Sequence, residues 1–358
     1  MLPAPSPYWV LRQHAPSPVH TVEFANGGEL LVVGDADGRV SITGLRDLRP
    51  VVMWRAHSAA LLRASAWRNY IVTHGRDNCV CAWTMPETAA SVTSGAPNAA
   101  PGPAPTLQLR VDVNTLNYCA YDMVLIPDTH GLHGWLAVPN TVDSAWIDVY
   151  ALPSRQRVAE AVGRSGTVQC GSTRPPITMS VRITLTAHAV LLVGGYEDGS
   201  LVWAHKPHRE SIMSMCLGPD ASHVYSVGAD DRIVCTALTP DATPHISGDQ
   251  HPGNACVAVR GDARVLAVGG WDAMVRVFAL PAMQPLAVLA YHKDSVYAAA
   301  YTPAAGSPHF VDLCDDSSSE DERGAGPLQP SAHVHSDRFA CGGKDGRVSL
   351  WDVPFTAA

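Results

Sequence analysis

The stretch Ala340–Val353, ACGGKDGRVSLWDV, decides the fold of this chain. It contains a short segment of small and apolar residues, a Lys-Asp-Gly turn signal, and a second segment in which apolar residues alternate. Because Gly and Asp favour tight turns and β-branched residues favour strands, the stretch predicts a β-hairpin. A lone two-stranded hairpin is only marginally stable in water, so this one needs further strands beside it.

The hairpin pattern is repeated along the chain. Each copy has a short apolar strand, a turn rich in Gly and Asp, and a strand of alternating apolar residues. Six further copies begin at Leu30, Tyr70, Trp135, Leu191, His223 and Arg264, and the copy at Trp135 is the weakest. A unit that recurs every ~30 to 75 residues indicates one repeat architecture rather than several separate domains.

A proline-led segment precedes three of the hairpin units. It has a proline, six mostly apolar residues and a histidine, as in Pro7–His14, Pro50–His57 and Pro285–His292. An inner strand follows each one, so a unit reads as outer strand, histidine loop, inner strand and hairpin. The first outer strand, Tyr8–Arg12, has no hairpin before it, and the last hairpin has no outer strand after it. We therefore expect the N-terminal strand to complete the last sheet, which closes a ring without exposed edges.

These units resemble the WD40-repeat family, and the resemblance covers almost the whole chain. Lys344–Gly346 followed by Leu350–Asp352 is close to the family consensus. The resemblance implies an all-β fold, a seven-bladed WD40 β-propeller that spans residues 1–358 as a single domain and is closed by the N-terminal strand. It also implies a structural network of polar side chains in two units: His57, Thr73, Asp77 and Trp83 in the second, and His292, Cys341, Asp345 and Trp351 in the seventh, where Cys341 stands at a Ser or Thr position of the family.

His57, Thr73 and Asp77 also contain the three chemical types of a hydrolase triad, in which a base oriented by a carboxylate activates a hydroxyl. Their spacing fits the blade network better, because the histidine can link the aspartate, the hydroxyl and the indole N–H. A buried polar group left without such a partner costs ~1–3 kcal/mol. We therefore expect these residues to be structural and the protein not to be an enzyme. Alanine at His57 is expected to loosen the second blade.

The nine cysteines do not have the spacing of a disulfide framework, which favours a reducing compartment. Cys79 and Cys81 alternate along one strand, so both thiols face the same side. A zinc site needs two further ligands, and no second Cys-x-x-Cys motif or histidine pair follows. We expect core thiols, and neither a metal nor another cofactor. Three histidine pairs are expected to be solvated in loops: His130 and His133, His205 and His208, and His333 and His335.

Two segments are expected to lie outside the packed blades. Residues 86–106 are rich in Pro, Ala and Ser and predict a flexible loop between the second and third units. Residues 312–332 are acidic and predict a disordered loop within the seventh unit. Ser317, Ser318 and Ser319 each have an acidic residue three positions later, the pattern read by an acid-directed kinase. The segment is either a phosphorylated docking segment or a solvating acidic loop.

The composition argues against several classes of protein. The formal net charge is −8, and six acidic residues lie between Asp312 and Glu322, so the rest of the chain is nearly neutral. No basic stripe is present, which argues against direct binding of nucleic acid. No apolar run approaches the ~18–20 residues of a membrane span, and the N-terminus lacks the pattern of a signal peptide.

A propeller fold does not specify a function, and the absence of a convincing catalytic constellation favours protein–protein recognition. Three stretches together with both ends of the chain resemble the fungal ASTRA-associated protein 1 family, which is related to animal G-protein β-subunit-like protein 1: Pro50–Leu62, Tyr70–Asn78 and Gly194–Leu201. The resemblance implies a non-catalytic WD-repeat scaffold subunit of the ASTRA complex. That complex is linked to chromatin remodelling and to the maturation and stability of kinases related to phosphatidylinositol 3-kinase.

The same resemblance implies the partners and the compartment. The partners are helical-repeat scaffold subunits of the ASTRA assembly and chaperone machinery, with this chain as a monomer within a hetero-complex. The implied localisation is the nucleus and also the cytoplasm. No basic cluster resembles a nuclear import signal, so nuclear residence is expected to depend on a partner.

Three alternatives stay open at this point. A heterotrimeric G-protein β subunit has a long N-terminal coiled coil, which is not expected here because about seven residues precede the first strand. A substrate receptor of a cullin-type ubiquitin ligase often has a Trp-Asp-x-Arg motif, whereas Trp351–Pro354 lacks the arginine. A hydrolase that uses His57 and Thr73 is the third.

Overall fold

The computed structural model describes most of the chain and leaves several segments aside. The described residues are 5–67, 69–84, 102–116, 118–126, 131–143, 145–163, 178–185, 190–193, 196–197, 200–201, 207–239, 241–248, 251–303 and 338–352. The predicted acidic loop, with Ser317, Ser318 and Ser319, lies outside them, and so does most of the predicted loop 86–106. Of that second segment, Gly102 donates its backbone N–H to Val51 O at 2.8 Å.

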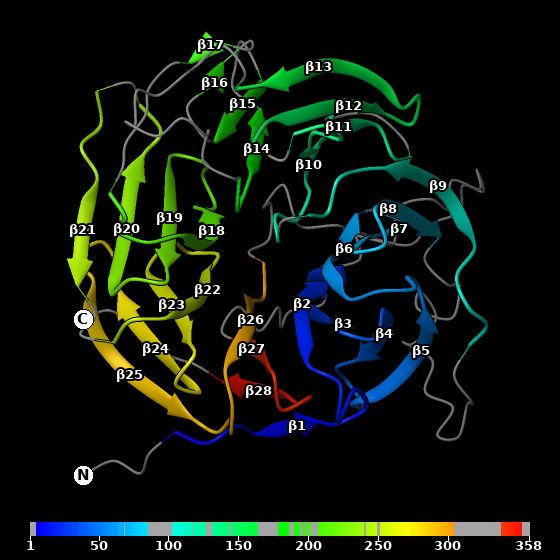
Figure 1. The fold of residues 1–358 in the computed structure, drawn as a ribbon. Coiled ribbons are helices and arrows are strands. Elements are labelled where there is room, and N and C mark those ends of the chain that lie inside the picture. The colour runs from blue at the N-terminus through cyan, green and yellow to red at the C-terminus, as the bar shows by residue number, and fades with distance from the viewer. Residues whose placement is uncertain are drawn as a thin grey trace, which may run out of the picture.

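The described residues form antiparallel four-stranded sheets around a common centre (Figure 1). The first three blades are β2 (Val19–Ala25), β3 (Leu30–Asp35), β4 (Arg39–Gly44) and β5 (Arg49–Arg55); β6 (Leu61–Trp67), β7 (Tyr70–Gly75), β8 (Cys79–Thr84) and β9 (Leu107–Asp112); and β10 (Asp122–Leu125), β11 (Gly134–Pro139), β12 (Ile147–Leu152) and β13 (Gln156–Val162). The one helical segment in the described part is a single 3-10 turn, η1 (Asn26–Gly28).

Four further sheets complete the ring. The fourth has β14 (Arg182–Leu185), β15 (Val190–Val193), β16 (Tyr196–Glu197) and β17 (Ser200–Leu201). The fifth and sixth are β18 (Ile212–Leu217), β19 (His223–Gly228), β20 (Arg232–Ala237) and β21 (His245–Gly248); and β22 (Asn254–Val259), β23 (Val265–Gly270), β24 (Met274–Ala279) and β25 (Gln284–Ala290). The last has β26 (Val296–Tyr301), β27 (Arg338–Gly343), β28 (Val348–Asp352) and β1 (Trp9–Leu11).

The expectation of a seven-bladed propeller is wrong, because only six of the sheets are full blades. In the fourth sheet, β16 and β17 have two residues each and pair over two positions each. The sequence predicts one hairpin there, beginning at Leu191. Two Gly-containing turn signals, residues 194–195 and 198–199, interrupt this part of the sequence, and Gly weakens a strand. The all-β propeller class is correct; the fourth unit is a reduced sheet.

The N-terminal strand closes the ring as predicted. β1 pairs antiparallel with β28, with Trp9 opposite Leu350 and Leu11 opposite Val348, and the two strands lie side by side in Figure 1. Tyr8 extends the pairing by donating its backbone N–H to Leu350 O at 2.9 Å. The last sheet therefore combines residues from both ends of the chain.

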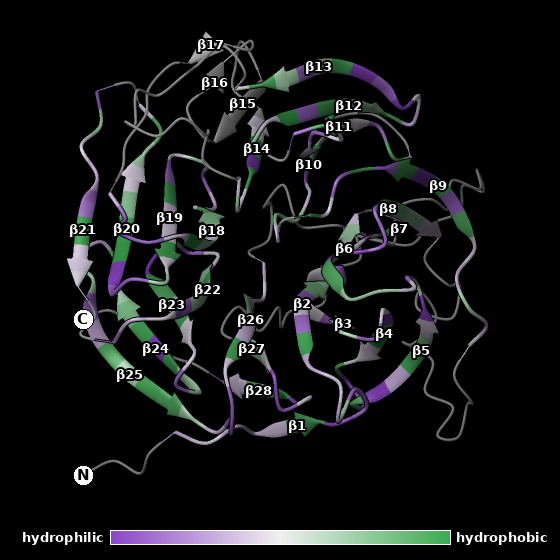
Figure 2. Ribbon diagram, in the orientation of Figure 1, coloured by the Kyte–Doolittle hydropathy of each residue, from purple (hydrophilic) through white to green (hydrophobic). Residues whose placement is uncertain are grey.

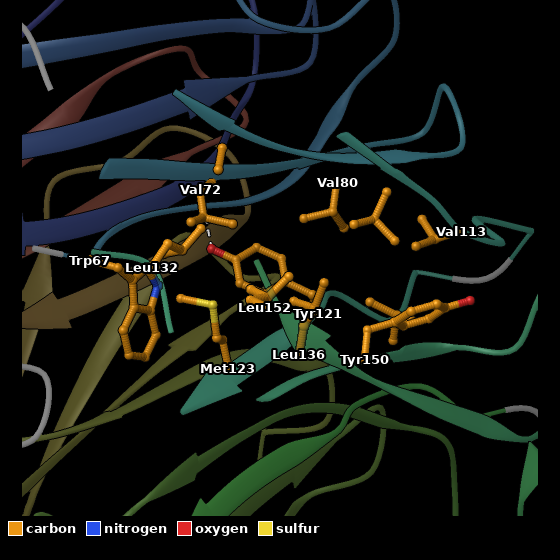
Figure 3. Close-up of a cluster of buried hydrophobic side chains, with 13 residues drawn as sticks. Trp67, Val72, Val80, Val113, Tyr121, Met123, Leu132, Leu136, Tyr150 and Leu152 are labelled. Atoms are coloured by element: carbon orange, nitrogen blue, oxygen red, sulfur yellow. Dashed lines mark hydrogen bonds between the residues drawn. The ribbon is translucent and has the colours of Figure 1, made fainter. Parts of the chain in front are cut away.

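The apolar core is divided into clusters that lie between neighbouring sheets. Apolar residues recur along the strands of the ring, as Figure 2 shows. One cluster joins the second and third blades and includes Trp67, Tyr121 and Leu136 (Figure 3). The buried Tyr121 keeps its polar end satisfied, because its hydroxyl donates to Val72 O at 3.0 Å. Burying each large apolar side chain contributes ~1.5–3 kcal/mol, so contacts between blades hold the ring together.

Candidate functional site

One face of the ring carries both the loops that precede the inner strands and the turns of the hairpins, and we call it the loop face. It consists of residues 12–18, 36–38, 56–60, 76–78, 113–116, 118–121, 140–143, 207–211, 229–231, 251–253, 271–273, 291–295 and 344–347. Backbone hydrogen bonds join loop to turn, among them Arg76 N to Ala60 O, Trp271 N to Gly253 O, and Lys344 N to Ser295 O, each at 2.8 Å. The predicted polar residues lie at or just below this face.

In the second blade, the structure brings the four predicted residues into one chain of hydrogen bonds. His57 Nδ1 lies 2.8 Å from Asp77 Oδ1, and His57 Nε2 lies 2.7 Å from Thr73 Oγ1. The indole N–H of Trp83 donates to the same Thr73 hydroxyl at 2.9 Å. His57 and Thr73 are both buried, so this hydroxyl and its base have no open path to a substrate. The geometry favours the structural interpretation over the hydrolase.

Hydrogen bonds favour the charged forms of His57 and Asp77 in this network. Burial lowers the pKa of His57, but hydrogen bonds with Cys79 and Asp77 outweigh it, so the net shift of the pKa is upward. For Asp77, burial raises the pKa of the carboxyl, but the Ser58 backbone N–H and His57 outweigh burial and lower it. The pair is therefore an arrangement in which each partner favours the charged form of the other.

In the seventh blade, the hydroxyl comes from a residue that was not predicted. His292 Nδ1 lies 3.1 Å from Asp345 Oδ1, but His292 Nε2 lies 2.9 Å from Ser349 Oγ. Trp351 Nε1 also donates to Ser349 Oγ, at 2.9 Å. Cys341 sits directly opposite Ser349 in the strand pairing, with its sulfur 3.0 Å from the hydroxyl oxygen. The available signal was the alternation along β28, which places Ser349 and Trp351 on one side of the strand.

Two further histidine networks were missed. In the first blade His14 Nδ1 lies 2.8 Å from Asp35 Oδ2, and His14 Nε2 lies 2.7 Å from Ser41 Oγ. In the fifth blade His208 Nε2 lies 2.9 Å from Ser226 Oγ, and its Nδ1 lies 3.0 Å from an oxygen of Asp230. The expectation of a solvated loop histidine is therefore wrong for His208, which is buried.

A row of charged side chains connects neighbouring inner strands, and sequence reasoning did not single it out. Arg63 on β6 lies between Glu23 on β2, at 3.7 Å, and Asp122 on β10, at 2.5 Å. Asp122 also accepts the backbone N–H of Ile183, at 2.9 Å. Burial raises the pKa of Glu23 to about 7, although the Arg63 guanidinium opposes this shift. These contacts link the inner strands β2, β6, β10 and β14 of four successive sheets.

Cys79 and Cys81 lie beside the second-blade network. Cys79 Sγ is 3.8 Å from Cys81 Sγ and 3.6 Å from His57 Nδ1, and the thiol donates to Asp77 Oδ1 at 3.2 Å. Among the described residues, His57, Cys79 and Cys81 form a group that could hold a metal ion, since their ligand atoms all lie within 4.8 Å of one another. The strand alternation correctly predicts that both thiols face one side.

The loop face also exposes an aromatic residue stacked on a cation. The Arg76 guanidinium lies 4.6 Å from the ring centre of Tyr118, and Nη1 donates to the Tyr118 hydroxyl at 3.3 Å. Tyr118 is 60% exposed and Leu116 is 82% exposed. We call Arg76, Leu116 and Tyr118 the Tyr118 patch. Large apolar side chains in the loop between β9 and β10, outside any strand, were the signal in the sequence that could have found it.

Comparisons with known proteins identify the relatives of the chain. A family model described as WD domain, G-beta repeat matches residues 5–43. ASTRA-associated protein 1 of Verticillium alfalfae is 30% identical over 98% of this chain and 93% of its own length. The chain belongs to the ASTRA-associated protein 1 family of WD40-repeat proteins. Both resemblances that the sequence predicted are thereby confirmed.

Other members of the ASTRA-associated protein 1 family and an animal relative match over similar spans. The Schizosaccharomyces japonicus member is 28% identical over 98% of this chain and 99% of its own length. Guanine nucleotide-binding protein subunit beta-like protein 1 of Mus musculus is 27% identical over 85% of this chain and 94% of its own length. No helix in the described part of the chain is long and apolar enough for a membrane span.

Proposed function

We propose that this protein is a non-catalytic scaffold subunit of an ASTRA assembly and that it binds protein partners through the loop face. The names of its relatives support the assembly, since those proteins are called ASTRA-associated protein 1. The Tyr118 patch is the observation that supports the loop face. Tyr and Arg are enriched among the few side chains that carry most of the binding energy of an interface.

The patch has the physical properties of a binding anchor. Tyr118 offers a large rigid ring with few rotatable bonds, so little conformational entropy is lost when a partner covers it. Arg76 already holds the ring in place through the stacking contact and the hydrogen bond. Leu116 adds apolar area that is exposed in the free protein. A partner that covers this region buries apolar surface without having to reorder the loop first.

The histidine networks support a role without catalysis. The four buried histidines of these networks, His14, His57, His208 and His292, use both ring nitrogens for hydrogen bonds to side chains, as His57 does with Asp77 and Thr73. Such groups hold the turns and loops of the loop face in fixed positions. The proposal therefore assigns rigidity to the networks and recognition to the exposed side chains above them.

The finer proposal rests on what the resemblance of the sequence implies. We place the protein in the nucleus and also in the cytoplasm, with helical-repeat scaffold subunits and chaperone machinery as partners and with a role in chromatin regulation and in the maturation of kinases related to phosphatidylinositol 3-kinase. The predicted phosphorylation of Ser317, Ser318 and Ser319 remains a sequence-based prediction.

Affinity purification of the tagged full chain, followed by mass spectrometry, tests the proposal. The double substitution L116A/Y118A is expected to reduce the recovery of co-purifying ASTRA subunits about tenfold or more, as loss of a binding anchor does. V288A is the matched control, because Val288 is half-exposed on the outer strand β25, away from the loop face. Equal recovery with all three proteins contradicts the loop-face assignment. Recovery of ubiquitin-ligase subunits in place of ASTRA subunits contradicts the assembly.

A further inference from the structure

The second blade differs from other blades at one position of its hairpin. The position is the residue that faces the last residue of the first hairpin strand. In the first, fifth and seventh blades this residue is an arginine: Arg39, Arg232 and Arg347. The second blade has Cys79 there, opposite Gly75. In the first blade the arginine carries positive charge to the network aspartate, since Arg39 Nε donates to Asp35 at 2.8 Å. In the second blade the equivalent side chain brings a thiol to Asp77.

A second thiol and an imidazole complete the group. Cys81 follows two positions later on β8 and is opposite Thr73, so its sulfur lies on the same side as that of Cys79. In the seventh blade the corresponding position is held by Ser349. Only the second blade therefore places two sulfurs beside its histidine and aspartate among the networks described above. Thiolate and imidazole are the ligands that favour zinc over magnesium or calcium.

Two of the separations between ligand atoms match tetrahedral zinc. Zn–S bonds of ~2.3 Å and Zn–N bonds of ~2.0–2.1 Å, at tetrahedral angles, separate two sulfurs by ~3.8 Å and a sulfur from a nitrogen by ~3.6 Å. The observed separations are 3.8 Å for Cys79 Sγ to Cys81 Sγ and 3.6 Å for Cys79 Sγ to His57 Nδ1. Asp77 Oδ1 is 2.8 Å from the same nitrogen, but Asp77 lies outside the group whose ligand atoms are all within 4.8 Å of one another. Its carboxylate therefore has to move away from His57 and toward Cys81 to become the fourth ligand. Its side chain is 19% exposed, at the turn of the hairpin, where such a shift is possible.

The surroundings of His57 fit a ligand bound through Nδ1. Metal-binding histidines donate their second ring N–H to a neighbouring acceptor, which fixes the ring. His57 Nε2 lies 2.7 Å from Thr73 Oγ1, and that hydroxyl is itself held by Trp83 Nε1 at 2.9 Å. The nearest histidine in sequence, His74, has a different role, because its Nδ1 accepts the backbone N–H of Tyr121 at 3.1 Å.

We propose that His57, Asp77, Cys79 and Cys81 form a binding site for a soft divalent cation, with zinc as the ion that fits the ligand set. On binding, the two thiols and the imidazolium of His57 lose protons to solvent, so that Nδ1 is free to bind, and the four ligands surround the ion. The ion reaches the site from the loop face, past the partly exposed Asp77. Bound there, it joins the loop before β6 to the hairpin of the second blade.

Cobalt substitution in the purified full chain tests this site. Co²⁺ bound by thiolates has a strong charge-transfer absorption whose intensity rises with the number of sulfur ligands. We expect one equivalent of Co²⁺ to give the intensity of two thiolates and to be displaced by one equivalent of Zn²⁺. Co²⁺ that binds without this absorption sits on surface groups and contradicts the proposal. Failure to bind a stoichiometric ion also contradicts it.

Single substitutions assign the ligands. C79S and C81S are each expected to remove one thiolate from the absorption and to weaken Zn²⁺ binding by more than the ~10- to 100-fold that loss of an outer-shell partner costs. C341S is the matched control, because Cys341 is equally buried and lies 3.6 Å from His292 in the seventh blade. Circular dichroism checks that each variant is folded. An unchanged absorption in folded C79S and C81S, or an equal loss in C341S, overturns the assignment.

Discussion

The hydroxyl that receives the tryptophan N–H comes from different strands in different blades. In the second blade it is Thr73 on the first hairpin strand, with Cys81 opposite, whereas in the seventh it is Ser349 on the second hairpin strand, with Cys341 opposite. The two residues of the facing pair have thus exchanged strands. Because both positions point into the same space, either can satisfy the histidine and the indole. The repeat pattern in the sequence predicts the hydroxyl of the second blade but not that of the seventh.

Substitutions of Ser349 and Cys341 test which of the two side chains links His292 to Trp351. S349A is expected to lower the free energy of unfolding by ~1–3 kcal/mol, because Trp351 Nε1 and His292 Nε2 lose their common partner in a buried place. C341S keeps a small polar side chain at the facing position and is expected to cost less than S349A. Urea unfolding followed by tryptophan fluorescence gives both values. A larger loss in C341S than in S349A contradicts the assignment of Ser349.

Between elements, the structure joins residues that no local pattern connects. Arg63 on β6 reaches back to Glu23 on β2 and forward to Asp122 on β10. Hairpins were predictable because turn and strand signals lie within one short stretch, as in Ala340–Val353. Contacts between adjacent inner strands depend on the ring and on the strand register, which the sequence does not show. The row of charges was missed for this reason.

Glu23 is expected to make stability depend on pH. Its pKa is raised to about 7 in the folded protein by burial, against 4.5 as its ordinary value. The folded state therefore holds this proton more tightly. Its contribution to stability is fully present below pH 4.5 and is lost as the pH rises through about 7. The loss is at most ~3 kcal/mol, since each pKa unit corresponds to ~1.36 kcal/mol.

The substitution E23Q isolates this effect. Glutamine has nearly the same shape and does not titrate, so the free energy of unfolding in E23Q should fall less between pH 4.5 and 7 than in the unaltered protein. E29Q is the control, because Glu29 is exposed on the turn after η1. Chemical denaturation at a series of pH values supplies the comparison. Identical pH profiles for E23Q and the unaltered protein rule out Glu23 as the source.

At the scale of the whole molecule, closure by β1 explains the hairpin at Ala340–Val353. The hairpin strands β27 and β28 lie between the inner strand β26 and the N-terminal β1 in one sheet. Leu11 of β1 is buried in the same apolar cluster as Val348 and Leu350. This arrangement was predictable from an outer strand without a hairpin and a hairpin without an outer strand. The reduced fourth sheet was not, because the stretch that begins at Leu191 fits the pattern of one hairpin, although it contains two Gly-containing turn signals.

Removal of residues 1–12 is expected to lower stability by several kcal/mol. The deletion removes β1, exposes the edge of β28 and takes Leu11 out of its cluster, and burial of such a side chain alone is worth ~1.5–3 kcal/mol. Removal of residues 1–6 is the control, since it leaves β1 and Tyr8 in place. Thermal unfolding compares the two. Equal melting temperatures for both truncated proteins show that β1 contributes nothing to closure.

Hydrogen–deuterium exchange of the full chain, alone and within its purified assembly, tests most directly whether partners bind the loop face. Slower exchange in the assembly is predicted for residues 113–116 and 118–121 and for the turn 76–78, which together hold the Tyr118 patch. The outer strands β5, β13 and β25 are expected to exchange equally in both states. Protection confined to those outer strands, with unchanged exchange around Tyr118, contradicts the proposed binding surface.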